Sequence, residues 1–353
     1  MKILYVAGRE KTYSRTHNVL HALLKQNYQV VECFPPDRSF KHYPQLIAQT
    51  FSRHRDCDLI LVGFYGQILL PFVRWLTGKP ILFDMYIATY DTMVHDRDKA
   101  RDGSFRANVF KMSDRLCGRL SQRLILETQD HIRDFSKKFA IPQEKFRRLF
   151  LAVDDSVLYP RIVPKDTDRF LVHFHGEYAP FHGVNHIIQA ANLLRDEHIE
   201  FQIVGRGITY ERDRTLAADL KLNNIRFIDP VPYTELAHLI ARADVCLGIF
   251  GENNRMLRVL TNKVIESIAM QKSLITGRNQ PVQELLTHMS SAYLIERANP
   301  RALANAIAHL KNDPHLRQKL ADGGYQVFKK HCTLERFSKG LSDIIEEMVR
   351  NGN

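Results

Sequence analysis

Residues 247–277 read LGIFGENNRMLRVLTNKVIESIAMQKSLITG. The segment starts with a short apolar run, passes through a polar loop into a helical pattern, and ends on a second apolar run. Two apolar runs joined by a helix are the pattern of a βαβ unit, in which the two strands are parallel. This stretch therefore predicts a parallel sheet covered by helices on both faces.

The same alternation of apolar runs and helical patterns extends over the whole chain. Continuous apolar runs are typical of strands that are buried on both faces. The strands expected in the first half are 3–7, 30–34, 59–63, 81–84, 124–127 and 149–153. Those expected in the second half are 170–174, 201–204, 225–228, 245–249, 274–276 and 293–295. The chain is therefore predicted to form two doubly wound α/β domains.

The domain boundary is predicted from a polar stretch that carries Pro160 and Pro164, because proline resists helix formation and fixes the backbone. We expect an N-terminal domain over 1–158, a linker over 159–168, a C-terminal domain over 169–333, and a closing helix over 334–353. The closing helix could pack back on the N-terminal domain. Open α/β sheets bind ligands at the carboxyl ends of their strands, so we expect the active site in a cleft between the domains.

Composition restricts the class of partner. The chain has 353 residues and a formal net charge of +11, which favours an anionic partner: nucleotide, acidic lipid, acidic glycan or nucleic acid. No nucleic-acid-binding module is recognisable, so nucleic acid is not expected. Five scattered cysteines and no apolar run of roughly 20 residues favour a cytoplasmic protein that meets membranes only at their surface.

The helix inside the opening segment carries the candidate site. Thr261 or Asn262, after Leu260, can cap this helix, and its free N–H groups together with Arg258 and Lys263 suit a diphosphate. Glu266 lies one turn further along and can accept hydrogen bonds from the two hydroxyls of a ribose. The alternative is a surface helix with an ordinary first-turn glutamate.

The segment resembles the donor-binding region of family-four glycosyltransferases, which have the GT-B fold of two Rossmann-like domains facing across a cleft. In that family two glutamates lie eight positions apart, and the second binds the nucleotide ribose. Glu266 matches the second glutamate, whereas Arg258 occupies the place of the first. The segment is similar to members that carry Asn-Lys-x-x-Glu, here Asn262, Lys263 and Glu266.

Other segments resemble the same family in the same order along the chain: 152–160, 172–191 and 201–207. The resemblance places Gly176, Gly205 and Arg206 beside the donor. An arginine and a lysine commonly hold the diphosphate in the family, and this chain has Glu177 and His182 instead.

A carboxylate near a diphosphate is repulsive, so other groups must balance the charge of the phosphates. The candidates are Arg206, Arg255, Arg258 and Lys263.

In the first domain, Gly8 ends the first strand, and Thr12 or Ser14 could cap the helix that follows. Asp84 ends the fourth strand and matches the place where the family has a His or Asp near the acceptor hydroxyl. A carboxylate there could orient or deprotonate that hydroxyl. Asp91 and His95 on the same loop are alternatives, and a structural helix cap is a further one.

Residues 105–123 carry apolar positions at helical spacing with Lys111, Arg115, Arg119 and Arg123 alongside. A basic amphipathic helix of this kind can lie on an anionic membrane surface. The alternative is a helix packed on its own sheet with a solvated charged edge.

The resemblance implies transfer of a sugar from a nucleoside diphosphate sugar to a glycan or lipid-linked acceptor, with retention of configuration and with neither a metal nor a separate cofactor. Surface polysaccharide or glycolipid assembly at the inner face of the cytoplasmic membrane is the expected setting. A catalytically silent binding protein on the same scaffold is one alternative, and a nucleotide-sugar epimerase or hydrolase is another. His173, His175 and His182 could suggest a metal, but no regular carboxylate or cysteine partner accompanies them.

Overall fold

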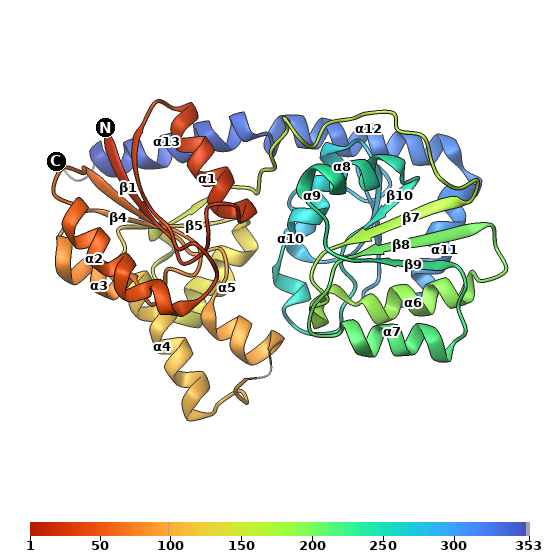
Figure 1. Ribbon diagram of the computed structural model, residues 1–353, viewed down its shortest axis with the longest axis horizontal. Helices are drawn as coiled ribbons and strands as arrows, with labels where there is room; N and C mark the ends of the chain where they lie inside the picture. The colour runs from red at the N-terminus through yellow and green to blue at the C-terminus, as the bar shows by residue number, and fades with distance from the viewer. Residues whose placement is uncertain (98, 351–353) are drawn as a thin grey trace. The chain divides into compact units, whose positions relative to one another are not determined.

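The computed structural model describes residues 1–97 and 99–350, and the chain divides into two compact units. The first unit is Met1–Ala152 together with Leu334–Asn353, and the second is Val153–Thr333 (Figure 1). The division at Val153 assigns residues 153–158, expected in the first domain, to the second unit. The last three residues of the expected closing helix, 351–353, lie outside the described residues.

The first unit contains a six-stranded parallel sheet in the order β2-β1-β3-β4-β5-β6. Its strands are β1 (Lys2–Val6), β2 (Gln29–Cys33), β3 (Leu59–Val62), β4 (Ile81–Asp84), β5 (Arg123–Leu126) and β6 (Phe146–Arg148). Its helices are α1 (Ser14–Lys25), α2 (Tyr43–Arg53), α3 (Leu70–Thr77), α4 (Phe105–Leu120), α5 (Gln129–Phe139) and α13 (Leu334–Arg350).

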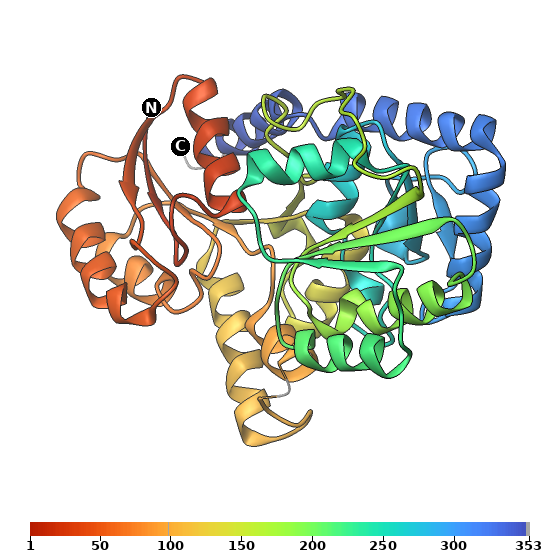
Figure 2. The same ribbon diagram turned by 45° about the vertical axis from the view of Figure 1, so that its right-hand side comes forward.

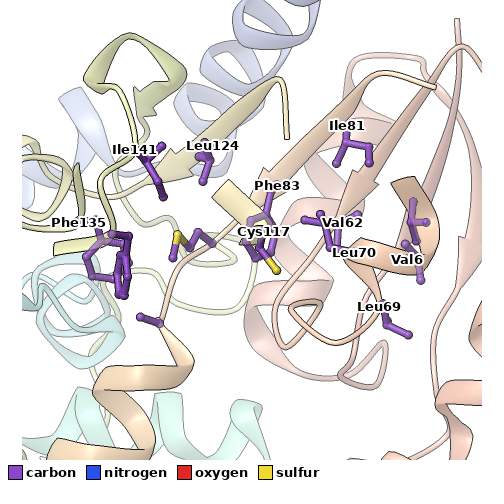
Figure 3. Close-up of a cluster of buried hydrophobic side chains, with 14 of the residues drawn as sticks. Val6, Val62, Leu69, Leu70, Ile81, Phe83, Cys117, Leu124, Phe135 and Ile141 are labelled. Carbon is purple, nitrogen blue, oxygen red and sulfur yellow. The ribbon is translucent and has the colours of Figure 1, made fainter. Parts of the chain in front are cut away.

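Side chains from both faces of this sheet are buried, as the continuous apolar runs predict. One face packs beneath helices α2 to α5, where Val62, Phe83, Cys117 and Phe135 share a cluster (Figure 3). The other face packs beneath α1 and α13, which contact each other. The closing helix α13 is thus part of the first unit.

The second unit contains another six-stranded parallel sheet, in the order β12-β11-β10-β7-β8-β9. Its strands are β7 (Phe170–His175), β8 (Ile199–Val204), β9 (Ile225–Ile228), β10 (Val245–Leu247), β11 (Ser273–Gly277) and β12 (Tyr293–Ile295). Its helices are α6 (Val184–Leu193), α7 (Tyr210–Asp219), α8 (Tyr233–Arg242), α9 (Asn262–Ala269), α10 (Gln280–Gln283), α11 (Pro300–Asn312) and α12 (Pro314–His331). Helices α6 and α7 lie on one side of the sheet, and α8 and α9 lie on the other (Figures 1 and 2).

The strand order reverses direction at β7, whose neighbours are β8 on one side and β10 on the other. Open α/β sheets bind ligands outside the carboxyl ends of the strands at such a reversal, because the helices on either side diverge there. In the second unit this point lies between the loop after β7 and the loop after β10, which leads to α9. The predicted doubly wound fold is confirmed, and the opening segment of sequence lies at the reversal.

The prediction of the sixth strand is wrong. The strand β6 is Phe146–Arg148, whereas residues 149–153 are not in a strand. Leu149 and Ala152 are buried because they pack with α13, on the face that also carries Phe337. Apolar character reports burial, and it does not distinguish a strand from a chain buried beneath a helix. The other expected strands all overlap observed ones.

The expected helix over 105–123 is α4, which ends at Leu120, and Arg123 is the first residue of β5. All five cysteines are buried and free. Among the described residues, no helix is both long enough and apolar enough to cross a bilayer.

Candidate functional site

Helix α9 positions two ionisable side chains in its first turns, Lys263 and Glu266. The helix is buried along its length, and both side chains are only 5 to 6% exposed. A charged group in such a place must be paired or hydrogen-bonded, because its hydration is lost. The partners of Lys263 and Glu266 therefore define what the site can do.

The Glu266 carboxylate accepts hydrogen bonds from two side chains. His175 at the end of β7 donates from Nε2 to Oε2 over 2.7 Å, and the Tyr233 hydroxyl at the start of α8 donates to Oε1 over 3.2 Å. Burial, followed by the negative charge of Glu266, raises the pKa of Tyr233, so its phenol keeps the proton that it donates. Each carboxylate oxygen has lone pairs that remain for further hydrogen bonds.

A chain of hydrogen bonds leads from the middle of the sheet to Glu266. Gln202 Nε2 donates to His173 Nδ1 over 2.7 Å, and His173 Nε2 lies 2.9 Å from His175 Nδ1. The orientation of the Gln202 amide is defined by two further partners, because Nε2 donates to the Leu239 carbonyl and Oε1 accepts from Arg226.

The direction of this chain follows from its first link. Since His173 Nδ1 accepts from Gln202, its proton is on Nε2, and it donates to His175 Nδ1. His175 then carries its proton on Nε2 and donates to Glu266. Burial, followed by the neighbouring His175, lowers the pKa of His173 well below its usual value, so the ring is neutral. His173 thus orients His175, and His175 holds the Glu266 carboxylate in one orientation.

Lys263 points into the loop after β7. Its Nζ lies 3.0 Å from His182 Nε2, and His182 Nδ1 donates to the Glu177 carbonyl. Burial lowers the pKa of Lys263 to about 8, against the opposing effect of the Glu266 and Glu177 carboxylates. The pKa of His182 is lowered well below its usual value by burial and then by Lys263. The site therefore offers a lysine ammonium at neutral pH, with a histidine ring as its acceptor.

Two glycines let the chain approach this lysine closely. Gly176 has a φ of 140°, and a Cβ at this position would lie 2.9 Å from Lys263 Cε. Gly205 has a φ of 127°, and a Cβ there would lie 2.1 Å from the Gly176 carbonyl oxygen. Both φ values belong to a region that side chains disfavour. The predicted glycine positions at the ends of β7 and β8 are thus brought together beside Lys263.

The start of α9 differs from the predicted cap. Thr261 is the N-cap residue, but its side chain makes no capping hydrogen bond, and its buried Oγ1 has no partner among the described residues. The first helical residue is Asn262, so it is not the cap. The Leu260 side chain is buried, which leaves its backbone as the part that could meet a ligand. The first turn of a helix leaves N–H groups without intrahelical partners, so the anion-binding property does not depend on the side-chain cap.

The three arginines predicted to hold the diphosphate differ in burial and in their contacts. Arg258 is half-buried at the end of a 3₁₀ turn, Met256–Arg258, three residues before the N-cap. Arg255 is buried with its guanidinium over the Phe181 ring, at 4.8 Å from the centroid. Arg206 is exposed and forms an ion pair with Asp229 over 2.6 Å. A role for Arg206 at a diphosphate would require this surface pair to open.

In the first unit, Asp84 at the end of β4 is only 1% exposed. Both of its oxygens accept from Arg15, from Nε and from Nη2, each over 2.8 Å. The Arg15 guanidinium also lies 5.1 Å from the ring centroids of Tyr86 and Phe337. A bidentate pair with arginine occupies both carboxylate oxygens, which indicates a structural role. The catalytic role of Asp84 stays a prediction.

The two alternatives to Asp84, Asp91 and His95, also have charged or polar partners within the first unit. Asp91 accepts from Lys138 Nζ over 3.0 Å, and His95 Nε2 lies 3.9 Å from the same carboxylate. Gly8 lies where a Cβ would meet the Tyr43 hydroxyl at 2.2 Å, so tight packing explains this glycine.

The expected cap of the helix after β1 is wrong. The N-cap of α1 is Tyr13, which makes no side-chain capping bond, rather than Thr12 or Ser14. Ser14 is the first helical residue.

Within the described part of the chain, no group of three or more His, Cys, Asp or Glu side chains is arranged to hold a metal ion. An open hollow of about 540 Å³ lies beyond the ends of β11 and β12, lined by Glu252, Arg278, Glu296, Arg297 and Ala298. None of these residues was expected at the site, and none bonds to Glu266.

Sequence reasoning missed Tyr233 and Gln202 as residues of this site. Tyr233 starts a helix 33 positions before Glu266, and Gln202 lies inside a buried strand, where a polar residue is unusual. A buried glutamine in an apolar strand is a weak signal of a polar partner, because buried amides are normally hydrogen-bonded. Nothing in the sequence marks Tyr233.

Part of the chain matches a known protein family. Residues 158–327 match the family described as "Glycosyl transferases group 1". The matched residues lie within the second unit and include β7, α9 and Glu266.

Solved structures extend the likeness to both units. Sucrose-phosphate synthase from Thermosynechococcus elongatus has a TM-score of 0.80 at 13% identity, covering 99% of this chain and 99% of that chain. HepE of Anabaena, in complex with UDP and glucose, has a TM-score of 0.77 at 13% identity, covering 98% of this chain and 99% of that chain. A glycosyltransferase from Rickettsia africae has a TM-score of 0.72 at 13% identity over 99% of this chain and 98% of that chain. The predicted GT-B fold is thereby confirmed. No curated protein matches the sequence.

Proposed function

We propose that this protein is a glycosyltransferase that moves a sugar from a nucleoside diphosphate sugar to an acceptor hydroxyl. The observation that carries the proposal is the Glu266 carboxylate, buried at the start of α9 and held by hydrogen bonds from His175 and Tyr233, with the Lys263 ammonium one turn away. Such a carboxylate keeps acceptor capacity for ribose hydroxyls, and the lysine and helix N-terminus suit a diphosphate. HepE has been solved with UDP and with UDP-glucose, which makes UDP-sugars the first donors to test.

In the proposed reaction, the acceptor hydroxyl attacks the anomeric carbon, and the bond from that carbon to the diphosphate oxygen breaks. Negative charge develops on the departing diphosphate, where Lys263, Arg258 and the N–H groups of the first turn of α9 would stabilise it. The resemblance in sequence favours retention of configuration without a resident metal. The acceptor hydroxyl proton passes to an oxygen of the departing diphosphate, so that the step balances.

We further propose a glycan or lipid-linked acceptor, in surface polysaccharide or glycolipid assembly on the cytoplasmic side of a membrane. The basic composition of the chain supports an acidic partner.

The test is transfer by the Glu266→Ala variant. We expect loss of transfer from a UDP-sugar while the circular dichroism spectrum stays that of the wild type. The matched control is Glu235→Gln, which changes an exposed carboxylate in the first turn of α8 and should leave transfer unchanged. Near-normal turnover by a folded Glu266→Ala protein would contradict the assignment.

A catalytically silent binding protein is the second candidate, and one observation favours it. The carboxylate expected to act at the acceptor, Asp84, is closed into an ion pair with Arg15. Measuring the release of nucleoside diphosphate separates the candidates. A transferase releases it only with acceptor, a hydrolase releases it without acceptor, and a binder releases none.

A further inference from the structure

Helix α4 carries an apolar stripe that faces solvent. Phe105, Val109, Met112 and Leu116 recur every three or four residues, which places them on one side of the helix. All four are exposed, Phe105 by 83% and Met112 by 59%. We call these four side chains the α4 stripe. Burial in the core of the first unit does not explain their apolar character.

The opposite side of α4 is the side that packs on the unit. Ala107, Asp114, Cys117 and Gly118 are buried, and they lie half a turn away from the α4 stripe. Asp114 Oδ1 and Oδ2 accept from the backbone N–H groups of Thr89 and Tyr90, over 3.0 and 2.8 Å. The orientation of α4 is thus defined by its buried face.

The charges of α4 are all positive on its outer sides. Arg106 lies on one flank of the α4 stripe, and Lys111, Arg115 and Arg119 lie on the other. The only acidic residue of α4 is Asp114, which faces inward. The outward surface therefore combines apolar groups with net positive charge and carries no carboxylate from this helix.

The neighbouring helix α3 adds a second apolar side. Ile68, just before α3, and Phe72 and Trp75 within it share one face, and all are exposed. Trp75 is 82% exposed and is the only tryptophan of the chain. Helices α3 and α4 pack against each other, and both bury their other faces in the same core cluster. Tryptophan is enriched where proteins meet the interface of a bilayer.

We propose that the α4 stripe, with Trp75, docks this protein on an anionic lipid bilayer. Aliphatic and aromatic groups flanked by basic residues match the boundary between acyl chains and negatively charged headgroups. A soluble protein partner would have to supply both a large apolar groove and acidic flanks. The inference goes beyond glycosyl transfer, because lipid binding needs neither donor nor acceptor.

The single tryptophan reports directly on this contact. With vesicles of phosphatidylcholine containing about one third phosphatidylglycerol, Trp75 emission of the full chain should shift to shorter wavelength, and lipids brominated in the acyl chains should quench it. Vesicles of phosphatidylcholine alone should give little shift, because the basic flanks contribute only on an anionic surface. An unchanged emission at saturating anionic vesicles would overturn the proposal.

Vesicle co-sedimentation with variants tests the residues. The double variant Phe105→Glu, Met112→Glu should lower the partition coefficient at least about tenfold, and Lys111→Glu, Arg119→Glu should do so by a similar factor. The matched control is Ile162→Glu, Ile208→Glu, which adds the same charge at two fully or largely exposed apolar positions of the second unit. It should bind nearly as well as the wild type.

Two results would contradict the proposal. The first is binding by Phe105→Glu, Met112→Glu that equals that of the wild type. The second is a wild-type dimer in sedimentation equilibrium that this double variant dissociates, because the α4 stripe would then bind a second copy of the chain. Donor turnover measured on the same variants distinguishes loss of docking from failure of the proposed transferase activity.

Discussion

Two buried carboxylates of this protein end up in opposite chemical situations. Asp84 is the last residue of β4 in the first unit, and Glu266 lies in α9 at the strand reversal of the second unit. Both are less than a tenth exposed. Arg15 donates from its guanidinium to both oxygens of Asp84, whereas each oxygen of Glu266 accepts a single hydrogen bond, one from His175 and one from the Tyr233 phenol.

The difference teaches that burial at the end of a strand does not identify a ligand site. A bidentate arginine satisfies a carboxylate in charge and in geometry, so little capacity is left for substrate. Single hydrogen bonds to each oxygen orient a carboxylate but leave lone pairs available, and a ligand that donates hydrogen bonds can then add to them. The nature of the partner separates a structural acid from a binding one.

The largest effect is expected from breaking the ion pair between Asp84 and Arg15. Asp84→Ala leaves the Arg15 charge buried without a partner and should lower the free energy of unfolding by about 3–5 kcal/mol, measured by urea denaturation. Replacing both residues, as Arg15→Met with Asp84→Leu, should recover most of this loss, because no buried charge then remains. If Asp84→Ala instead keeps wild-type stability and loses transfer, Asp84 acts at the substrate.

Removing the charge of Glu266 should act on binding more than on folding. Glu266→Gln turns two charge-assisted hydrogen bonds to the ribose into weaker ones, so the affinity for UDP should fall by ~1.5–3 kcal/mol, roughly 10- to 150-fold. Isothermal titration calorimetry measures this loss. Asp84→Asn, tested at a temperature where it is folded, is the matched amide substitution and should change UDP affinity little. Equal losses in the two variants would remove the distinction between the two carboxylates.

The charge on Lys263 gives the site a pH dependence. The pKa of Lys263 is lowered to about 8, so the free site holds the ammonium below pH 8 and loses it above. A bound diphosphate favours the ammonium, and the affinity for UDP should therefore be flat below pH 8 and fall above it, by up to about tenfold per pH unit. Titrations from pH 6.5 to 9.5 check this. The Lys263→Met variant should bind UDP more weakly at pH 7, and its affinity should no longer fall above pH 8. If the affinity of Lys263→Met still falls above pH 8, another group causes the pH dependence.

The smallest effect is expected from interrupting the series of hydrogen bonds that leads through His173 and His175 to Glu266. His173→Leu removes the donor to His175 Nδ1, so His175 can rotate or change tautomer, and UDP affinity should fall by ~1 kcal/mol, about fivefold. The control is His186→Leu, a buried histidine of α6 outside the chain of hydrogen bonds. Nuclear magnetic resonance of the His175 ring nitrogens should report the change of tautomer in His173→Leu alone. Unchanged nitrogen signals would contradict the assigned direction of the chain.

The sequence predicted most of the architecture, because parallel strands buried on both faces leave continuous apolar runs. The exception was residues 149–153, which are buried beneath α13 rather than in a strand. Predictions about capping were weaker. Thr261 occupies the N-cap of α9 without making the bond, and Tyr13 rather than Thr12 or Ser14 precedes α1. A cap depends on backbone angles and side-chain rotamers that residue type only biases.

By itself, the sequence determined the order of strands and helices, the polar loop that enters α9, and the placement of Lys263 and Glu266 in the first turns of that helix. These are local properties, which the spacing of residues along the chain encodes. The partners of each carboxylate were decided only by the tertiary structure. Glu266 meets His175 from 91 positions away, because the sheet order places β7 beside β10, and Asp84 meets Arg15 from 69 positions away. Hydrogen bonds act only over about 3 Å, so a residue's partner is known only once the fold has brought distant segments into contact.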